Sequence, residues 1–584
     1  MKVGDPDRPD RGGYLRIGNR DQTRAHVHGP RWWRSHMTGS LRTNDNAVTE
    51  VELKLQLDES AAKAVHDWVV SRGGRRERLR ARYFDTSGLS LAESGMALRL
   101  RYERGRWVQT LKAALPGAIT RFEHEVIVQR GRPDMPPSLD PARHQGTEAA
   151  PLLMRALERA GPEGLINHFE TDIRRTAVRF RSRRGEVEVC LDSGIIAAPG
   201  RHPLPVCEIE VELVKGSPLA VTDVARQVIR GHPCWVDLVS KAERGHRLAA
   251  GQGQSGAAKA RSVSIDPQAD SLAAARLVTH ECRRQLLANL ASIASGTSDD
   301  PEYVHQARVA VRRLRTAIRL FDVDPLRNLD EPARALARAL GLTRERDVLL
   351  ESVAPALALA GAPTTDLAAL ANAGDARSVV RSRDSQVFVV DLLAGELTLA
   401  RSAAPVLAPA GPQLVARLSQ WHRQVRRDSK LFSTLDDERR HRLRRRMKRL
   451  RYGIEFCRAL CSDKRYRRYL QELSEAQEAL GRYNDLIEAL ASYRAQIESD
   501  PRAWFAVGWL TAEAKAQSLR CETALSALRN LKAPWKNRYL APQAVTAHPA
   551  GMADAAADLA PIAAPATAAG APAEHPAREP VKPT

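Results

Sequence analysis

The sequence predicts an α+β protein of several domains, in which a strand-rich half precedes an all-helical half. Residues 48–248 alternate apolar and charged positions with the period of β-strands. Residues 271–540 are rich in Ala, Leu and Arg with a helical period, and residues 249–270 have the Gly, Ser, Ala and Gln content of a linker. Residues 1–47, which are basic, and residues 541–584, which are rich in Ala and Pro, lack such periodicity and are predicted to be disordered.

Composition points to a polyanionic partner. The 584 residues carry a formal net charge of +21, and most of the excess lies in the helical half. Such a charge suits nucleic acid, an anionic membrane or a phosphate polymer, but aromatic residues are only 5%, which argues against stacking on exposed bases. Seven cysteines without a CxxC pair argue against a disulfide framework. We find no apolar run long enough to span a membrane and no secretory leader, so we expect a cytoplasmic protein without a membrane partner.

Charged residues of both signs recur at alternate positions in the strand half. Glu50, Glu52 and Lys54 share one face of a predicted strand, while the residues between them are apolar. The same alternation returns in Arg99 with Arg101, in Arg121 with Glu123 and Glu125, and in Glu208 with Glu210 and Glu212. One such strand is typical of a solvated outer face. Its recurrence favours a closed barrel with a polar lumen, whose apolar outer faces pack against helices.

The lumen expected from this pattern suits a complex of a metal ion with a phosphate chain. Carboxylates in a row repel one another unless a cation lies between them, and their oxygens are the ligands that Mg²⁺ and Mn²⁺ prefer. Interleaved Arg and Lys side chains hold phosphate oxygens by charge-assisted hydrogen bonds. Nothing in the sequence marks a lowered thiol pKa, so we expect Cys190 and Cys207 to be packing residues rather than nucleophiles.

These motifs resemble the CYTH domain of the triphosphate tunnel metalloenzymes over about residues 48–248. The matching elements, in order, are Glu50-x-Glu52-x-Lys54, Tyr83-Phe84-Asp85-Thr86, Leu98-Arg99-Leu100-Arg101, Thr110-Leu111-Lys112, Glu123 with Glu125, Asp192, the Glu208–Glu212 run and Ser240-Lys241-Ala-Glu-Arg244-Gly245. The resemblance implies an eight-stranded antiparallel barrel that hydrolyses a triphosphate with Mg²⁺ or Mn²⁺. The family also includes adenylate cyclases and thiamine-triphosphatases, so it leaves the substrate open.

The resemblance also implies roles for individual residues. It makes the catalytic residues Glu50, Glu52, Lys54 and Lys112. It makes the phosphate-binding residues Lys54, Arg99, Arg101, Lys112, Arg121, Lys241 and Arg244. The metal, held directly or through water, falls to Glu50, Glu52, Glu123, Glu125, Asp192, Glu208 and Glu210. A second metal or a glutamate would activate the attacking water, and no covalent nucleophile is needed.

The helical half contains a duplicated motif with two basic stripes. The segment from His305 to Arg315 aligns with the segment from His441 to Arg451, and Leu340-Gly341 aligns with Leu480-Gly481 further along. Spacings of three and four residues place each stripe on one helix face: His305, Arg308, Arg312, Arg315 and Arg319, and then His441, Arg444, Lys448 and Arg451. No acidic residue lies within 305–319 or 441–451, so we expect these cations to lack acidic partners and to bind an anion.

These stripes resemble the CHAD domain, the conserved histidine α-helical domain, over about residues 271–535. The matching motifs include His305-x-x-Arg308, Lys448-Arg449-Leu450-Arg451-Tyr452 and Leu480-Gly481-x-x-Asn484-Asp485-Leu486. The resemblance implies two pseudo-symmetric helical bundles with a basic groove that binds inorganic polyphosphate. The two histidines either donate to phosphate or cap the packing, and zinc binding is disfavoured because neither has a second ligand at metal spacing.

Three hypotheses for function follow. The first is an inorganic triphosphatase whose barrel cleaves tripolyphosphate and whose helical half binds polyphosphate. The alternative is a non-catalytic or weakly catalytic protein that binds polyphosphate and locates to polyphosphate granules. Nucleic-acid binding through the arginine stripes is disfavoured because aromatic residues are scarce beside them and no helix-turn-helix or zinc-finger signature is present.

Overall fold

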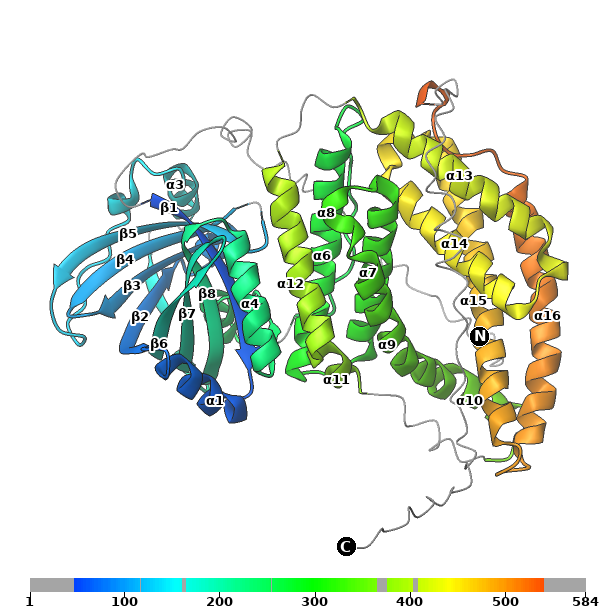
Figure 1. The fold of residues 1–584 in the computed structure, drawn as a ribbon, viewed down its shortest axis with the longest axis horizontal. Coiled ribbons are helices and arrows are strands. Elements are labelled where there is room, and N and C mark those ends of the chain that lie inside the picture. The colour runs from blue at the N-terminus through cyan, green and yellow to red at the C-terminus, as the bar shows by residue number, and fades with distance from the viewer. Residues whose placement is uncertain are drawn as a thin grey trace, which may run out of the picture.

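The computed structural model describes residues 47–539, except residues 116, 160–163, 254, 365–374 and 403–407. Of residues 342–348 and 350–351 it describes the backbone only. The segments predicted to be disordered, 1–47 and 541–584, therefore lie outside the described residues apart from the backbone of Ala47. Figure 1 shows a strand-rich part followed by a long helical part.

The strand half is an eight-stranded antiparallel barrel, as predicted. Its strands follow the order β5-β4-β3-β2-β6-β7-β8-β1, and pairing between β1 and β5 closes the barrel. A ninth short strand, β9, adds to β1 beside the end of β5. The bounds are β1 Ala47–Leu57, β2 Arg75–Asp85, β3 Met96–Glu103, β4 Arg106–Ala114, β5 Thr120–Arg130, β6 Ile166–Ser182, β7 Gly185–Ala197, β8 Leu204–Gly216 and β9 Cys234–Val236.

Apolar side chains on the outer faces of the barrel pack against helices. Val51, Leu53 and Leu55 of β1 belong to a buried cluster that includes residues of α4. A second buried cluster joins β3, β4 and β5 to α2 and α3. The helices of this half are α1 (Glu59–Val70), α2 (Ser90–Glu93), the 3-10 helix η2 (Pro141–His144), α3 (Ala150–Glu158), α4 (Leu219–Gly231) and α5 (Lys241–Ala249). The alternation of charged and apolar residues on β1 thus separates the lumen from the core.

Strand β2 alternates in the opposite sense, so the lumen is not charged throughout. Leu79, Ala81 and Tyr83 of β2 are buried and point into the lumen, while the arginines between them lie on the outside. These residues and Phe169 of β6 pack against α5. Gly245 makes this docking possible, because a Cβ there would lie 2.1 Å from the ring of Phe169. Helix α5 therefore packs on an apolar patch inside the barrel.

The helical half consists of two successive groups of helices, as the duplication predicts. The first group comprises α6 (Ser271–Ser295), α7 (Pro301–Phe321), α8 (Asp324–Arg327), α9 (Asp330–Val348), α10 (Ala354–Leu359), α11 (Ala376–Arg381) and α12 (Arg383–Arg401). The second comprises α13 (Gly411–Lys430), α14 (Asp437–Phe456), α15 (Asp463–Gln496) and α16 (Ala503–Arg529). The two basic stripes lie on α7 and α14, and the two Leu-Gly pairs lie on α9 and α15.

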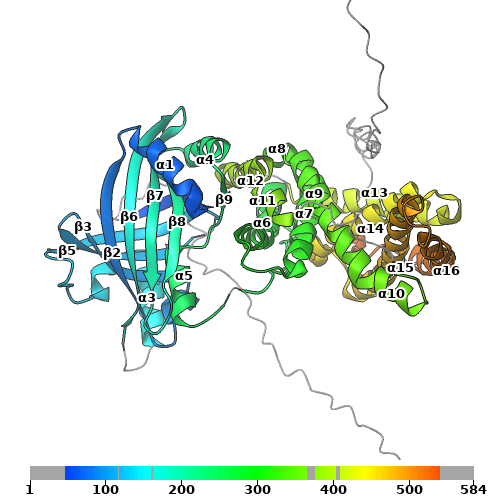
Figure 2. The ribbon, with the colours of Figure 1, turned by 90° about the horizontal axis from the view of Figure 1, so that it is seen from below.

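The two halves share one continuous apolar core, and Figure 2 shows α4 beside α12 where they meet. Arg226 of α4 donates to Asp391 of α12 at 2.5 Å. The connecting segment after α5 has no helix or strand, but it lies along α6: Asn289 hydrogen-bonds both backbone groups of Ala258, and Ile265 is 2% exposed. None of the helices described here is both long and apolar enough to cross a lipid bilayer.

Candidate functional site

The barrel encloses a cavity of about 700 Å³ whose lining is dominated by charged side chains. They come from alternate positions of seven strands and from α5. Of the residues singled out by sequence, those on the lining are Glu50, Glu52, Lys54, Arg99, Arg101, Lys112, Arg121, Glu123, Glu125, Asp192, Glu210 and Lys241. The other two, Glu208 and Arg244, are bonded to each other beside the lining. The fold therefore gathers around one cavity residues that are up to 194 positions apart.

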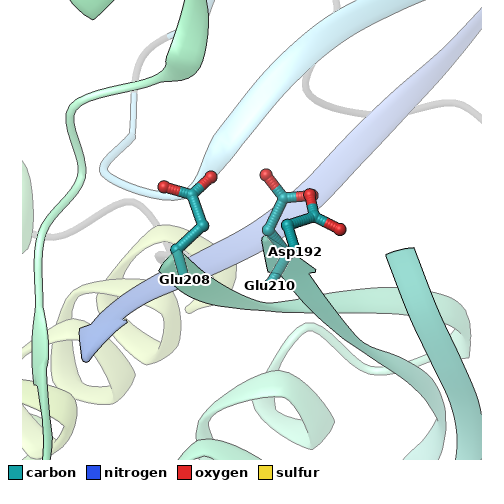
Figure 3. A group of neighbouring side chains, drawn as sticks. All are labelled: Asp192, Glu208 and Glu210. Carbon is teal, nitrogen blue, oxygen red and sulfur yellow. The ribbon is translucent and has the colours of Figure 1, made fainter. Parts of the chain in front are cut away.

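One end of the charged set is a cluster of three carboxylates from β7 and β8. Asp192, Glu208 and Glu210 have ligand oxygens within 4.8 Å of one another, and Figure 3 shows them side by side. The ammonium of Lys241 donates to all three, at 2.7 Å to Asp192 and 2.8 Å to Glu210. Arg175 of β6 donates to Asp192 at 2.7 and 2.6 Å and also contacts Glu210. Two cations thus hold a group of carboxylates that would otherwise repel one another.

These cations keep the cluster ionised although it is buried. Burial by itself raises the pKa of Asp192, but Arg175 and Lys241 outweigh it and lower the pKa below its usual value. Glu210 behaves in the same way, with Lys241, Arg175 and Lys54 lowering its pKa. A charge-neutral network of this kind has room to exchange one cation for another.

A second cluster of ion pairs links β1, β3, β4 and β5. Lys112 Nζ lies 2.7 Å from both carboxylate oxygens of Glu50 and 3.1 Å from Glu123. Arg99 lies 3.7 Å from Glu123 and from Glu125, and Arg101 lies 3.2 Å from Glu125. Burial lowers the pKa of Lys112, but Glu50 and Glu123 raise it above its usual value. Lys112 is therefore a permanently charged group at the centre of this cluster.

Lys54 connects the two clusters. It contacts Glu52 on its own strand and lies 3.8 Å from Glu210. Burial lowers its pKa to about 7, and Arg121 and Lys112 add to that effect while Glu210 and Glu50 oppose it. An additional anion in the cavity would restore its full charge, so Lys54 gains the most from a bound phosphate.

The donor set of the cavity fits a divalent cation. Asp192, Glu208 and Glu210 supply carboxylate oxygens, the ligands that Mg²⁺ and Mn²⁺ prefer, and a metal among them would take the place of the Lys241 ammonium. Glu212, opposite Glu52 in the pairing of β8 with β1, marks a second excess of negative charge. Burial, and after it Glu50, raises the pKa of Glu212 to about 7.

Sequence reasoning assigned no role to Arg175 and Tyr83. Arg175 sits next to Arg174, and in a pair of adjacent arginines the sequence does not show which one points inward; the structure leaves Arg174 exposed. Tyr83 belongs to the Tyr83-Phe84-Asp85-Thr86 motif, and its hydroxyl accepts a hydrogen bond from Arg99 at 3.3 Å. Ile173, two residues before Arg175 and also on the lining, is the signal that fixes the inward face.

In the helical half, α7 and α14 pack against each other and bring the two stripes together. Arg308 and Arg312 of α7 and Arg444 of α14 all act on Lys448 of α14, and these four residues form what we call the four-cation cluster. Burial and these three arginines lower the pKa of Lys448 to about 6, while Asp485 of α15 opposes them. The Nε of Arg444 is buried with no hydrogen-bond partner among the described residues. Such crowding of like charge is costly and is relieved by a bound anion.

The Leu-Gly pair of each copy supports the first arginine of its stripe. Arg308 donates to the carbonyl of Leu340 at 2.7 Å. In the second copy a Cβ on Gly481 would lie 3.5 Å from Nη2 of Arg444, so the glycine leaves room for the guanidinium. His441 hydrogen-bonds Asn484, whereas His305 is exposed. The duplicated motif therefore encodes the placement of Arg308 and Arg444.

The expectation that the stripes lack acidic partners is wrong at their far ends. Asp330, the first residue of α9, lies 3.0 Å from Arg315 and 2.9 Å from Arg319. Arg451 pairs with Glu455, one turn later on α14, at 2.9 Å. A count within the stripe misses both partners, because one comes from the next helix and the other lies just beyond the motif. These three arginines make structural ion pairs, which separates them from the four-cation cluster.

Known proteins share both halves of this architecture. Residues 49–244 match the family model of the CYTH domain, and residues 278–494 match that of the CHAD domain. Among solved structures, the CHAD domain from the plant Ricinus communis is 27% identical, with a TM-score of 0.39 over 47% of this chain and 97% of that one. A Hippeastrum protein named for adenylyl cyclase but with a dominant triphosphatase activity is 20% identical, with a TM-score of 0.24 over 35% and 96%.

A further similar structure is the PH1819 protein from Pyrococcus horikoshii OT3. It is 18% identical, with a TM-score of 0.21 over 31% of this chain and 89% of that one. The two family models together span both the charged barrel and the paired basic helices. Residues 49–244 are a CYTH domain and residues 278–494 are a CHAD domain, so the chain is a CYTH–CHAD protein.

Proposed function

We propose that this protein is a metal-dependent inorganic triphosphatase that hydrolyses tripolyphosphate in the lumen of the CYTH barrel. The observation that carries the proposal is the interleaving of buried carboxylates and cations around one cavity of about 700 Å³. Carboxylates alone would suit a metal, and cations alone would suit a phosphate chain. Their combination suits a metal–triphosphate complex, in which each charge finds an opposite one.

In this proposal Lys112, Lys54 and Arg99 exchange carboxylate partners for phosphate oxygens when substrate enters. Arg101, Arg121 and Lys241 extend the same line of cations. Glu50, Glu52 and the Asp192–Glu210 cluster then hold Mg²⁺ or Mn²⁺, which when bound neutralises phosphate charge and lowers the pKa of water. Because the side chains are already fixed by ion pairs, little reorganisation is needed at the moment of reaction.

The cavity supports an inorganic substrate rather than a nucleotide. On the described lining the ring-bearing side chains are Tyr83 and His246. The ring of Tyr83 stacks on Phe169 at 4.5 Å, and the ring of His246 packs edge-on against Phe169 at 5.0 Å. Both rings are thus engaged with Phe169, and the lining shows no further aromatic surface on which a base would stack.

We propose further that the CHAD domain binds inorganic polyphosphate at the four-cation cluster. Arg308, Arg312, Arg444 and Lys448 converge from two helices, and the Arg444 Nε has no partner among the described residues. Arginine forks match phosphate oxygens, and a bound polyanion would remove the repulsion that lowers the pKa of Lys448. Granules of polyphosphate are the expected cellular location of such a surface.

Phosphate release by the purified full-length protein tests the enzymatic proposal. Tripolyphosphate, ATP and long-chain polyphosphate are each supplied with Mg²⁺, Mn²⁺ or EDTA. We expect rapid release from tripolyphosphate, slower release from ATP, and none with EDTA. Absence of release from all three substrates, with polyphosphate binding retained, would instead favour the binding protein that locates to granules.

A further inference from the structure

The segment that carries Lys241 into the lumen is anchored on the CHAD domain. Strand β9 is the last strand in the sheet order, paired with β1 from Leu55 to Leu57, so no strand lies on its outer edge in the described chain. Gln386 of α12 covers this edge: its side-chain oxygen accepts from the backbone N–H of Val236 at 2.8 Å. The Gln386 amide also donates to the carbonyl of Val380 at 2.8 Å, and the residue is 2% exposed.

Arg381 makes a second anchor beside Gln386. Its guanidinium lies over the ring of Trp235 in β9, 4.0 Å from the centroid. It donates to Asp58, directly after β1, at 2.5 and 3.1 Å, and its Nε donates to the carbonyl of Ala294 in α6 at 2.7 Å. One side chain of the helical half thus holds both β9 and the end of the strand that carries Glu50, Glu52 and Lys54.

A short chain of contacts leads from β9 to the cations of α5. The N–H of Asp237 donates to the carbonyl of Lys54 at 3.2 Å, and Arg121 donates to the carbonyl of Leu238 at 3.3 Å. Ser240 then caps α5 by accepting from the N–H of Glu243 at 3.1 Å. The next residue, Lys241, reaches the three carboxylates drawn in Figure 3. Only four residues separate Val236 from Lys241.

We propose that Gln386 and Arg381 are positioning residues through which the CHAD domain sets the substrate-binding geometry of the CYTH lumen. They fix β9, and β9 fixes the start of α5, which places Lys241 and Arg244 among the carboxylates of β7 and β8. The inference rests on the proposed triphosphatase function for its kinetic consequence, while its structural part stands without it. The CHAD domain is then a component of the phosphate-binding site of the barrel as well as a binding module of its own.

The same interface supplies a matched control. Arg226 of α4 and Asp391 of α12 form an ion pair at 2.5 Å between the two halves. Helix α4 packs on the outer faces of the barrel strands, and neither residue contacts β9 or α5 in the described hydrogen bonds and ion pairs. Loss of this pair weakens the interface without touching the segment that leads to Lys241.

The test compares full-length wild type with Gln386→Met, Gln386→Glu and Asp391→Asn by amide hydrogen exchange and by tripolyphosphate kinetics. Gln386→Met keeps the side-chain length but removes the acceptor for Val236. We expect exchange to accelerate about tenfold over residues 234–249 and KM to rise about three- to tenfold, as for one lost hydrogen bond, with kcat changed by less than about twofold. Gln386→Glu retains an acceptor and is expected to lie between wild type and Gln386→Met, and Asp391→Asn is expected to match wild type.

Wild-type exchange over residues 234–249 in Gln386→Met would overturn the proposal, as would equal effects of Asp391→Asn. If Gln386→Met does not fold, Arg381→Gln, whose side chain lies at the rim of the interface, is measured by the same criteria. If the wild type releases no phosphate, the triphosphatase proposal fails. The exchange measurement then still decides whether the CHAD domain positions β9 and α5.

Discussion

Two buried lysines in this protein experience opposite electrostatic environments. Lys112 in the lumen lies within 3.1 Å of Glu50 and Glu123, and these carboxylates raise its pKa above the usual value although burial opposes them. Lys448 in the helical half lies among Arg308, Arg312 and Arg444, and burial together with these arginines lowers its pKa to about 6. The residue type and the burial are alike, so the neighbours decide the charge state.

The contrast shows how one chain can prepare two sites for phosphate in different ways. The lumen compensates its own charges, so a ligand that carries both a metal ion and phosphate can enter by exchange of partners. The four-cation cluster does not compensate its charges, so a polyanion without a metal relieves its repulsion. The first arrangement suits chemistry on a short chain held in place, and the second suits retention of a long chain.

Removal of Lys112 is the largest expected perturbation of the lumen. Lys112→Ala leaves Glu50 and Glu123 facing each other and removes a phosphate ligand, so we expect kcat/KM for tripolyphosphate to fall about a hundredfold or more. Lys63→Ala is the control, because Lys63 on α1 is 86% exposed and pairs only with Asp67 among the contacts described for it. Steady-state phosphate release, with circular dichroism to verify folding, measures the effect. Turnover near the wild-type level in Lys112→Ala would remove the lumen as the active site.

Arg175 offers a second test of the lumen, with a control next to it in sequence. Arg175→Gln removes the cation that Asp192 and Glu210 share, and we expect kcat/KM to fall about tenfold to a hundredfold. Arg174→Gln changes an exposed residue on the outer face and is expected to leave kcat/KM within about twofold of wild type. Equal kinetics of the two variants would show that Arg175 contributes packing alone.

The same pair of arginines shows where sequence reasoning succeeds and where it stops. Strict alternation on β1, β5 and β8 placed Glu50, Glu123 and Glu210 on one face, and closure of the barrel then brought those faces together. Alternation did not separate Arg174 from Arg175, and it placed no apolar residues inside, although Leu79 and Ala81 of β2 point inward. The sense of each alternation depends on where α5 packs, which is a tertiary contact.

The basic stripes show a related limit. Periodicity alone correctly placed Arg308 with Arg312 on one helix face and Arg444 with Lys448 on another. It could not show that α7 and α14 would face each other, nor that Asp330 from another helix would neutralise Arg315 and Arg319. Nor did the linker composition of residues 249–270 indicate that this segment would hydrogen-bond Asn289 of α6. Contacts between distant segments decide each of these points.

Arg444 tests the helical site independently of the lumen. Arg444→Ala removes a cation from the four-cation cluster, and we expect affinity for long-chain polyphosphate to fall about tenfold, with a shallower dependence on salt. Hydrolysis of tripolyphosphate is expected to stay at the wild-type level. Arg439→Ala, on the same helix but 62% exposed beside Asp436, is the control and should change affinity by less than about twofold. Titration of labelled polyphosphate measures both variants, and a loss as large in Arg439→Ala would reduce the effect to net charge.

The smallest expected effect is a pH dependence of polyphosphate binding, which follows from Lys448. Its pKa of about 6 means that the free protein gains this positive charge as the pH falls from 8 to 5.5. Burial, Arg312, Arg444 and Arg308 lower this pKa and Asp485 raises it, so a bound polyanion favours the charged form and binding takes up a proton. Affinity is therefore expected to rise several-fold toward low pH, at most about tenfold per pH unit for one proton. Lys448→Arg, which stays protonated, should bind more tightly than wild type at pH 8 and give a nearly flat profile. His441, whose pKa is also lowered by burial, gains charge in the same direction. A wild-type slope retained in Lys448→Arg would therefore assign the titration to histidine and remove Lys448 from the contrast with Lys112.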